Sequence, residues 1–308
     1  MTKYMFLGKK KKWWFIASGL LMVPGILALI FWHLPFGIDF KGGTELQIKT
    51  EKAATEDELR TKLTGLEQVR GLTLSKAEDN SYLIRLLPIT EEEHRQITDQ
   101  LSQDYGNITE VQFQSVGPSV SQDLTKKAIT AVVLAALLIV LYLAYSFRGL
   151  VAPISSWRFG VTAVIALTHD LVITVGTFAI FAHYLHYEID ASFITALLTV
   201  MGFSVHDTIV VFDRTRENAL KHREIAERDF EELADRSLSQ TLNRSLATSL
   251  TVIFTLTSLV FLGGDSIRPF VLTLLIGITI GAYSSIFTAT PLVVVWQQWA
   301  VRRAHQQS

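Results

Sequence analysis

The side chains best placed to do chemistry are ionisable groups inside long apolar stretches. Asp207 lies in a predominantly apolar run from Ala191 to Phe212. A carboxylate at membrane depth costs about 2.5–3.5 kcal/mol on insertion scales, so such residues usually serve proton or ion pathways and have a cationic partner. Arg244, at the start of the next apolar run, is the expected partner. We predict that Asp207 and Arg244 couple proton movement to function, with Asp170 as a second acid.

Hydroxyl side chains recur at helical spacing around these ionisable groups. After Arg244 they fall on one face of the predicted helix. Hydroxyl residues recur at similar spacing in the predicted helices that contain Asp170 and Asp207. If the three helices meet, these side chains enclose a polar seam within an apolar bundle. The alternative is ordinary helix adhesion, in which each such hydrogen bond contributes about 0.6 kcal/mol on average. The predicted seam consists of Thr174, Thr177, Thr199, Ser204, Thr248, Thr251 and Thr255.

Two further patterns accompany the seam. His169 and His206 each precede an acid and could relay protons near neutral pH, although a hydrogen-bonded structural histidine is the alternative. Gly277, Gly281 and Ser285 share the face of one apolar segment. Small residues at this spacing allow close helix approach, so this pattern predicts packing and no chemistry.

The elements that must position these residues are membrane-spanning helices, which need about 20 apolar residues each. We expect six, with basic residues concentrated before the first, between the second and third, between the fourth and fifth, and after the sixth. Such basic loops face the cytoplasm, so both termini, residues 1–12 and 297–308, are predicted to be cytoplasmic. The predicted spans are residues 13–34, 128–147, 159–181, 191–212, 246–262 and 269–296.

Residues 35–126 form a polar stretch between the first two spans and lie outside the cytoplasm in this topology. Capping boxes at Thr55–Glu58 and Thr90–Glu93 open two helices among segments that alternate like strands. The order β-α-β-β-α-β predicts a ferredoxin-like domain. The expected fold class is therefore membrane α-helical, a six-span bundle with one extracytoplasmic α+β ferredoxin-like domain. The cytoplasmic loop of residues 213–245 is expected to form an amphipathic helix along the membrane face, and a solvated connector that contacts nothing is the alternative.

Composition narrows the possible functions. The chain has no cysteine, which excludes disulfides and thiolate metal sites. No histidine pair has metalloprotease spacing, and no glycine loop of the phosphate-binding kind precedes a helix. We therefore expect no metal, no cofactor, no bound nucleic acid and no enzyme activity. We expect the six apolar segments to lie in a lipid bilayer.

Several motifs, in order along the chain, resemble the SecF family of protein-export membrane proteins. They lie at Gly37–Thr44, Val116–Ser119, Leu167–Asp170, Val205–Asn218 and Gln240–Leu246. The family often has asparagine where this chain has His206, so a histidine relay gains no support from the resemblance. The first motif also has a local interpretation as an external hinge, because paired glycines permit a sharp turn. The hinge residues are Gly37, Asp39, Phe40, Lys41, Gly42, Gly43 and Thr44.

The resemblance implies a pairing with SecD, a homologous six-span protein, in an assembly of the resistance-nodulation-division type. Such an assembly assists the Sec channel and its motor ATPase in moving preproteins, driven by the proton gradient. The implied location is the bacterial inner membrane, or an internal membrane in addition. Two alternatives are a structural subunit that stabilises SecD or the channel, and half of a proton-driven small-molecule exporter.

Overall fold

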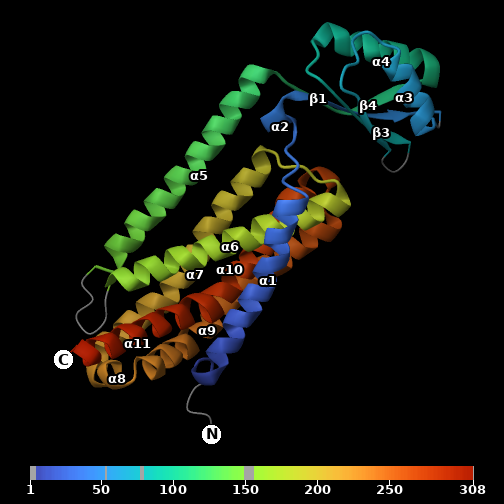
Figure 1. Ribbon diagram of the computed structural model, residues 1–308. Coiled ribbons are helices and arrows are strands. Elements are labelled where there is room, and N and C mark those ends of the chain that lie inside the picture. The colour runs from blue at the N-terminus through green and yellow to red at the C-terminus, as the bar shows by residue number, and fades with distance from the viewer. Residues whose placement is uncertain (1–4, 53, 77–79, 149–155, 308) are drawn as a thin grey trace. The chain divides into compact units, whose positions relative to one another are not determined.

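A computed structural model describes residues 5–52, 54–76, 80–148 and 156–307 (Figure 1). The first four residues of the predicted N-terminal segment and most of the loop between the second and third predicted spans lie outside these residues. The chain divides into two compact units, one made of residues 36–130 with 189–191 and the other of the remaining segments.

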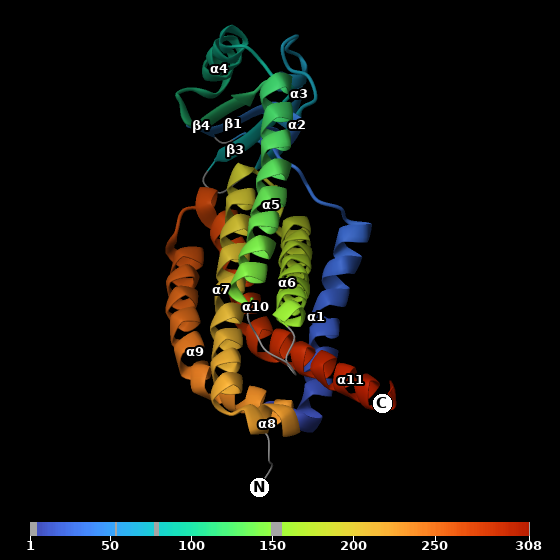
Figure 2. The ribbon, with the colours of Figure 1, turned by 90° about the vertical axis from the view of Figure 1, so that its left-hand side faces the viewer.

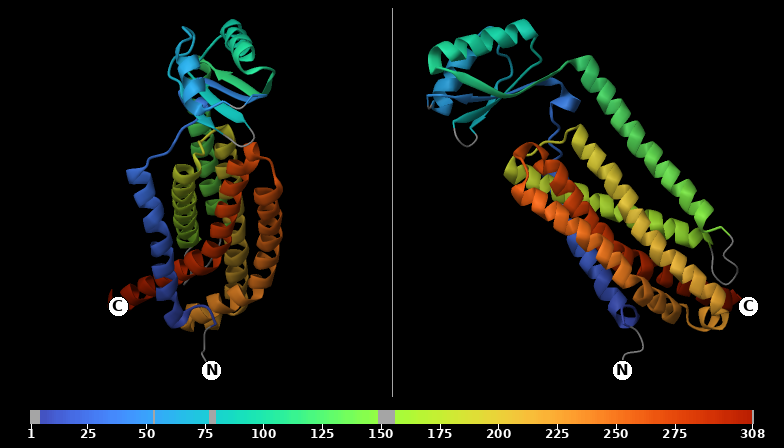
Figure 3. Two further views of the ribbon diagram at one scale, coloured as in Figure 1. Left: turned by 90° about the vertical axis from the view of Figure 1, so that its right-hand side faces the viewer. Right: turned by 180° about the vertical axis from the view of Figure 1, so that it is seen from behind.

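The larger unit is a helical bundle whose apolar helices meet the length needed to cross a membrane, with six candidate spans among the described residues. Within it, α6 packs against α1 and α10, and α10 packs against α9 (Figures 2 and 3). The helices are α1 (Lys11–Phe31), α5 (Pro118–Ser146), α6 (Ser156–Leu185), α7 (Ala191–Lys221), α8 (Arg223–Arg228), α9 (Phe230–Leu262), α10 (Arg268–Ser284) and α11 (Thr290–Gln307), with short 3₁₀ turns at Gly8–Lys10 and Asp265–Ile267.

Glycines set the closest helix approaches in the bundle. A Cβ atom at Gly277 would lie 2.3 Å from a methyl group of Val200, and one at Gly281 would lie 3.1 Å from Cβ of Ser204. The small-residue face of α10 therefore packs against α7. These two contacts bring Ser204 close to the centre of the bundle, where it is 1% exposed.

The sixth predicted span is interrupted by a π-helix at Ser285–Ala289, between α10 and α11. Pro291 follows this turn, and proline lacks the N–H group that a helix needs and crowds the carbonyl four residues earlier. The hydroxyl of Thr290 donates to the carbonyl of Ser285, five residues earlier, at 2.9 Å. Widening of the turn before a proline is thus the local cause of the interruption.

The helices around the fourth and fifth predicted spans extend beyond their apolar parts. Helix α7 continues to Lys221, α8 follows, and α9 begins at Phe230, so most of the predicted loop 213–245 is helical. The length of an apolar run predicts only the part of a helix that lies in the membrane. Charged residues such as Arg, Lys and Glu have high helix propensity, so the helix can continue beyond that run into water.

The smaller unit is a four-stranded antiparallel sheet in the order β2-β3-β1-β4, formed by β1 (Gly43–Thr50), β2 (Thr73–Lys76), β3 (Ser81–Leu86) and β4 (Ile108–Val116). Helices α3 (Glu56–Thr64) and α4 (Glu91–Tyr105) begin at the two predicted capping boxes, both of which are formed. Their apolar faces and the inward side chains of the strands make one core, which includes Leu46, Ile48, Leu59, Ile84 and Ile97. With six candidate spans and this βαββαβ sheet, the predicted fold class is confirmed.

Candidate functional site

Asp207 lies on α7 in the interior of the bundle and is 1% exposed. Its carboxylate accepts a hydrogen bond from Ser249 Oγ of α9 at 3.1 Å. His206 Nδ1 lies 3.8 Å from the other carboxylate oxygen, and the side chain of this histidine is 66% exposed. Ser249 falls between the positions of the predicted hydroxyl stripe, which is why sequence spacing did not identify it.

Arg244 is exposed on α9, and the described residues show no ion pair between it and Asp207. The hydroxyl groups that follow it on the same face are exposed too, and each donates to a carbonyl of its own helix. Thr195, Thr199 and His206 on α7 are likewise exposed. We call this surface the α7–α9 polar face; it comprises Thr195, Thr199, His206, Arg244, Thr248, Thr251, Thr255 and Ser258.

Asp170 on α6 is fully buried and joins three helices. Its Oδ2 atom accepts hydrogen bonds from Ser204 Oγ of α7 and Ser284 Oγ of α10, both at 2.6 Å. Its Oδ1 atom lies 2.9 Å from His169 Nδ1. The other ring nitrogen of His169 is buried with no hydrogen-bond partner among the described residues. Ser284 was not among the predicted residues, because it lies one position before the residue chosen for packing.

The predicted seam therefore divides into a buried and an exposed part. Thr174 is buried and donates to the carbonyl of Asp170, and Ser204 bonds the carboxylate of Asp170. Thr177 is half-buried on α6. The remaining predicted residues, Thr199, Thr248, Thr251 and Thr255, lie on the α7–α9 polar face. Helical spacing placed each residue on a face, but it did not say which face turns inward.

The predicted hinge motif is built around Asp39 in the smaller unit. Its carboxylate accepts hydrogen bonds from Gln114 Nε2 at 3.1 Å and from the backbone N–H of Ala191 at 2.9 Å. Residues Ile38–Lys41 form the short helix α2. Gly42 and Gly43 follow with φ angles of 76° and 146°, a region that favours glycine. The motif thus turns the chain into β1, where Thr44 bonds Ser115 at 2.8 Å.

Two carboxylates at the start of α9 hold the N-terminal segment, a contact that sequence reasoning did not find. Asp235 accepts hydrogen bonds from the backbone N–H groups of residues 5–7, each at 2.8 Å. Glu231 accepts from the N–H of Gly8 at 2.7 Å and from Nζ of Lys11 at 3.0 Å. Both residues are only 7% exposed. We call these contacts the N-terminal clamp; they fix the start of α1 to α9.

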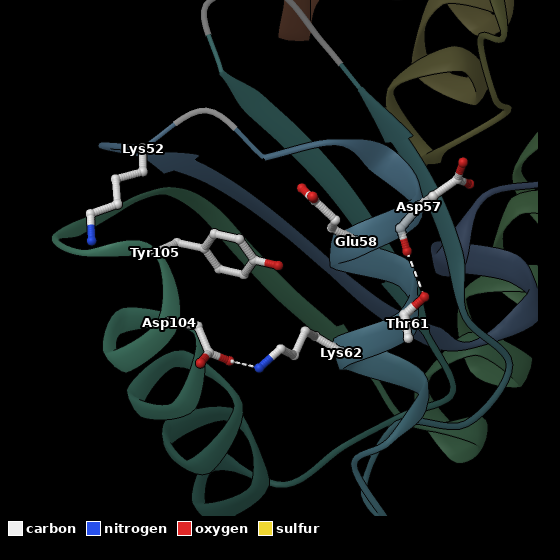
Figure 4. A pocket seen from close by; sticks show the side chains of 7 residues that line it. All are labelled: Lys52, Asp57, Glu58, Thr61, Lys62, Asp104 and Tyr105. Atoms are coloured by element: carbon white, nitrogen blue, oxygen red, sulfur yellow. Dashed lines mark hydrogen bonds and ion pairs between the residues drawn. The ribbon is translucent and has the colours of Figure 1, made fainter.

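The smaller unit also has an open pocket of about 640 Å³ (Figure 4). Lys62 and Asp104 in its wall form an ion pair at 3.1 Å, and Glu58 belongs to a capping box. Burial raises the pKa of the Tyr105 hydroxyl, and the charges of Glu58 and Asp104 add to this effect. Because Lys62, Asp104 and Glu58 already have partners within the domain, we assign the pocket no chemical role. Its lining residues are Lys52, Asp57, Glu58, Thr61, Lys62, Asp104 and Tyr105.

We compared this chain with models of known protein families. The family model described as "Protein export membrane protein SecD/SecF, C-terminal" matches residues 96–299, and "SecD/SecF GG Motif" matches residues 33–54. The chain belongs to the SecD/SecF family. The resemblance inferred from the motifs is confirmed, and with it the role of a multi-pass membrane subunit for protein translocation.

Among its relatives is the protein translocase subunit SecF of Thermobaculum terrenum, which is 43% identical over 294 residues and aligns with 92% of this chain and 91% of that protein. SecF of Anaerolinea thermophila is 36% identical, with 93% and 92% covered.

The crystal structure of SecDF from Thermus thermophilus, described as a translocon-associated membrane protein, superposes with a TM-score of 0.79 at 31% identity. The match covers 94% of this chain and 38% of SecDF. SecDF in its super-membrane-facing form matches with a TM-score of 0.66, 31% identity, and 95% and 39% covered.

Proposed function

We propose that this chain works with SecD as a proton-driven accessory subunit of the Sec translocase. The two proteins would assist the Sec channel and its motor ATPase in moving preproteins across the bacterial inner membrane. The observation that carries this proposal is the state of Asp170 and Asp207. Both are buried in candidate membrane spans, and neither contacts a lysine or arginine among the described residues. A buried charge without a partner is costly, and a proton is the simplest species that neutralises it.

The cycle we propose alternates the partners of Asp207. In this structure its carboxyl group accepts a hydrogen bond from Ser249 of α9, while Arg244, also on α9, is exposed. Ionised Asp207 pairs with Arg244 after a rearrangement of α7 against α9, and protonation releases that pair. A switch of this kind needs two packings biased by a local charge change. The membrane potential supplies about 2.3 kcal/mol per charge per 100 mV, enough to shift such an equilibrium.

SecD is the partner that we propose for the α7–α9 polar face. Arg244 lies at the start of the fifth predicted span, and four exposed hydroxyl residues follow it along α9, so this polar face on a spanning helix favours a protein neighbour over lipid. The relatives named SecDF align with this chain over about two-fifths of their own length, which leaves room for a SecD part in the same protein. Proximity of a SecD acid to Arg244 would complete the charge balance.

The orientation that we propose follows from the basic loops. Both termini and the charged segment 213–245 face the cytoplasm, and the domain of residues 35–126 faces outward, where it transmits movement to the preprotein. The motif Gly37–Thr44 is the hinge through which the chain passes from α1 into that domain. The same orientation holds in an internal membrane that carries the Sec machinery.

The test is gradient-dependent preprotein transport in vesicles that carry Asp207→Asn together with SecD, normalised to assembled complex. We expect loss of the gradient response with normal assembly. Asp213→Asn is the matched control, because Asp213 lies on the same helix, is exposed and pairs with Arg216. A normal gradient response in Asp207→Asn would overturn proton coupling at this residue. Reduced complex abundance with unchanged transport per complex would instead favour a purely structural subunit.

A further inference from the structure

Asp170 is connected to α1 by an unbroken series of contacts that runs through the π-helix Ser285–Ala289. We propose that this π-helix converts protonation of Asp170 into movement of α1, which makes Ser284, Phe287 and Thr288 positioning residues of the coupling. The inference rests on the proposed proton-driven function and deepens it. Each step below lies in the larger unit.

The first contact is a hydroxyl group with two alternative acceptors. Ser284 Oγ lies 2.6 Å from Asp170 Oδ2 and 3.3 Å from the carbonyl oxygen of Gly281. A serine hydroxyl has one hydrogen to donate. Facing an ionised carboxylate, it donates to Asp170. When Oδ2 carries a proton, the carboxyl group becomes the donor toward Ser284, and the serine hydrogen turns to the carbonyl of Gly281.

The second step is the π-helix, which begins at the residue after Ser284. A π-helical turn is rare, occurs mostly as a single turn inside an α-helix and is frequent at functional sites. Here Pro291, which has no N–H group, follows the π-helix, and the Thr290 hydroxyl reaches back across the turn to donate to the carbonyl of Ser285. A change in the hydrogen bonds of the last α10 turn acts directly on this wider turn. The π-helix is therefore the element that can adopt two arrangements.

The third step is the contact between the π-helix and α1. The ring of Phe287 packs against that of Trp14 with centroids 4.1 Å apart. Thr288 Oγ1 and Ser18 Oγ share a hydrogen bond of 2.8 Å, and both side chains are buried. The hydroxyl of Tyr283 also donates to the carbonyl of Trp14 at 3.3 Å. A shift of the π-helix thus pushes on one side of α1, from which the chain continues into the motif Gly37–Thr44.

The surroundings of Asp170 support a proton as the trigger. Among the described residues, His169 is the titratable group that contacts it, and the other two contacts are the serines of α7 and α10. Gain or loss of a proton by Asp170 or His169 therefore changes the charge of a buried site where three helices meet. Asp170→Asn imitates the protonated acid with almost the same shape.

The test follows the signal of Trp14 by fluorine NMR in the complex with SecD, labelled with fluorotryptophan. The Trp14→Phe variant assigns the signal among the six tryptophans of this chain. We expect Asp170→Asn and Ser284→Ala each to move the Trp14 signal. Thr279→Val is the matched control on α10, because its exposed hydroxyl bonds only the carbonyl of Leu275 in its own helix. Thr288→Val should lower gradient-dependent transport several-fold with both acids intact.

The outcomes separate this inference from the proposed function. Loss of the gradient response in Asp170→Asn with an unmoved Trp14 signal would overturn the π-helix route and leave proton coupling in place. An unmoved Trp14 signal in the folded Ser284→Ala variant, or normal transport in Thr288→Val, would overturn the route as well. A full gradient response in both Asp170→Asn and Asp207→Asn would instead reject proton coupling through these acids.

Discussion

At the scale of single residues, the two buried acids differ in the number of groups that hold them. Asp170 has three side-chain contacts from three helices, whereas Asp207 has Ser249 and a distant His206. Fewer contacts leave Asp207 freer to exchange partners. Asp207 therefore suits the proposed exchange with Arg244, and Asp170 suits the proposed junction at which three helices respond to its charge.

Ser249 provides the residue-scale prediction. Ser249→Ala removes the hydrogen bond to Asp207, and a hydrogen bond between neutral groups contributes about 0.5–1.5 kcal/mol. We expect gradient-dependent transport per assembled complex to fall by up to about tenfold. Ser239→Ala on the same helix should leave transport near the parent rate, because its exposed hydroxyl bonds only the carbonyl of Asp235. Equal rates for the two variants would show that Ser249 has no part in the mechanism.

At the scale of elements, the glycines of α10 decide how near Ser204 and Ser284 come to Asp170. Gly277→Ala places a methyl group 2.3 Å from Val200, and overpacking typically costs about 1–3 kcal/mol. We expect a lower melting temperature of the purified protein, restored in part by Val200→Ala. Gly202→Ala in α7 should not lower it, since nothing lies within 4 Å of an added Cβ atom. Failure of Val200→Ala to rescue would mean that the strain lies elsewhere.

The capping box of α4 gives a prediction about pH. Hydrogen bonds from the backbone N–H and the hydroxyl of Thr90 lower the pKa of Glu93 below its ordinary 4.5. A lowered folded pKa means that this contact stabilises the domain above that ordinary value and is lost as the pH falls through the lower folded value. Glu93→Gln should therefore melt at a lower temperature than the parent at pH 7. The difference should disappear in strong acid, and a difference that persists there would contradict the charge-based account.

The N-terminal clamp acts at the same scale, because it ties α1 to α9. Asp235→Ala leaves three backbone N–H groups without their acceptor, and the buried one, that of Leu7, alone costs about 1–3 kcal/mol when unsatisfied. We expect faster hydrogen exchange at residues 5–8. Asp213→Ala is the control, as it removes an exposed carboxylate from α7. Unchanged exchange in Asp235→Ala would show that the clamp does not hold this segment.

At the scale of the whole molecule, the α7–α9 polar face is a polar surface on candidate spans that the described residues leave exposed. Thr251→Trp places a bulky ring in the middle of this face and should reduce co-purification of SecD several-fold. Leu20→Trp is the matched control on α1, where Leu20 is 74% exposed and apolar. Full recovery of SecD with Thr251→Trp would place the interface on another face.

The sequence by itself determined the apolar spans, the βαββαβ order and both capping boxes, because these depend on composition, period and neighbouring residues. It also identified Asp170, Asp207 and Arg244, since charge in an apolar run needs no structure to be noticed. Only the tertiary structure decided which side of each helix turns inward. The spacing of residues along a helix fixes where they lie relative to one another around the helix axis. The rotation of the whole helix about that axis depends on its contacts with distant segments. For this reason Ser249, Ser284 and Asp235 became visible only in the fold, and the predicted stripe of threonines on α9 turned out to face away from the chain's own core.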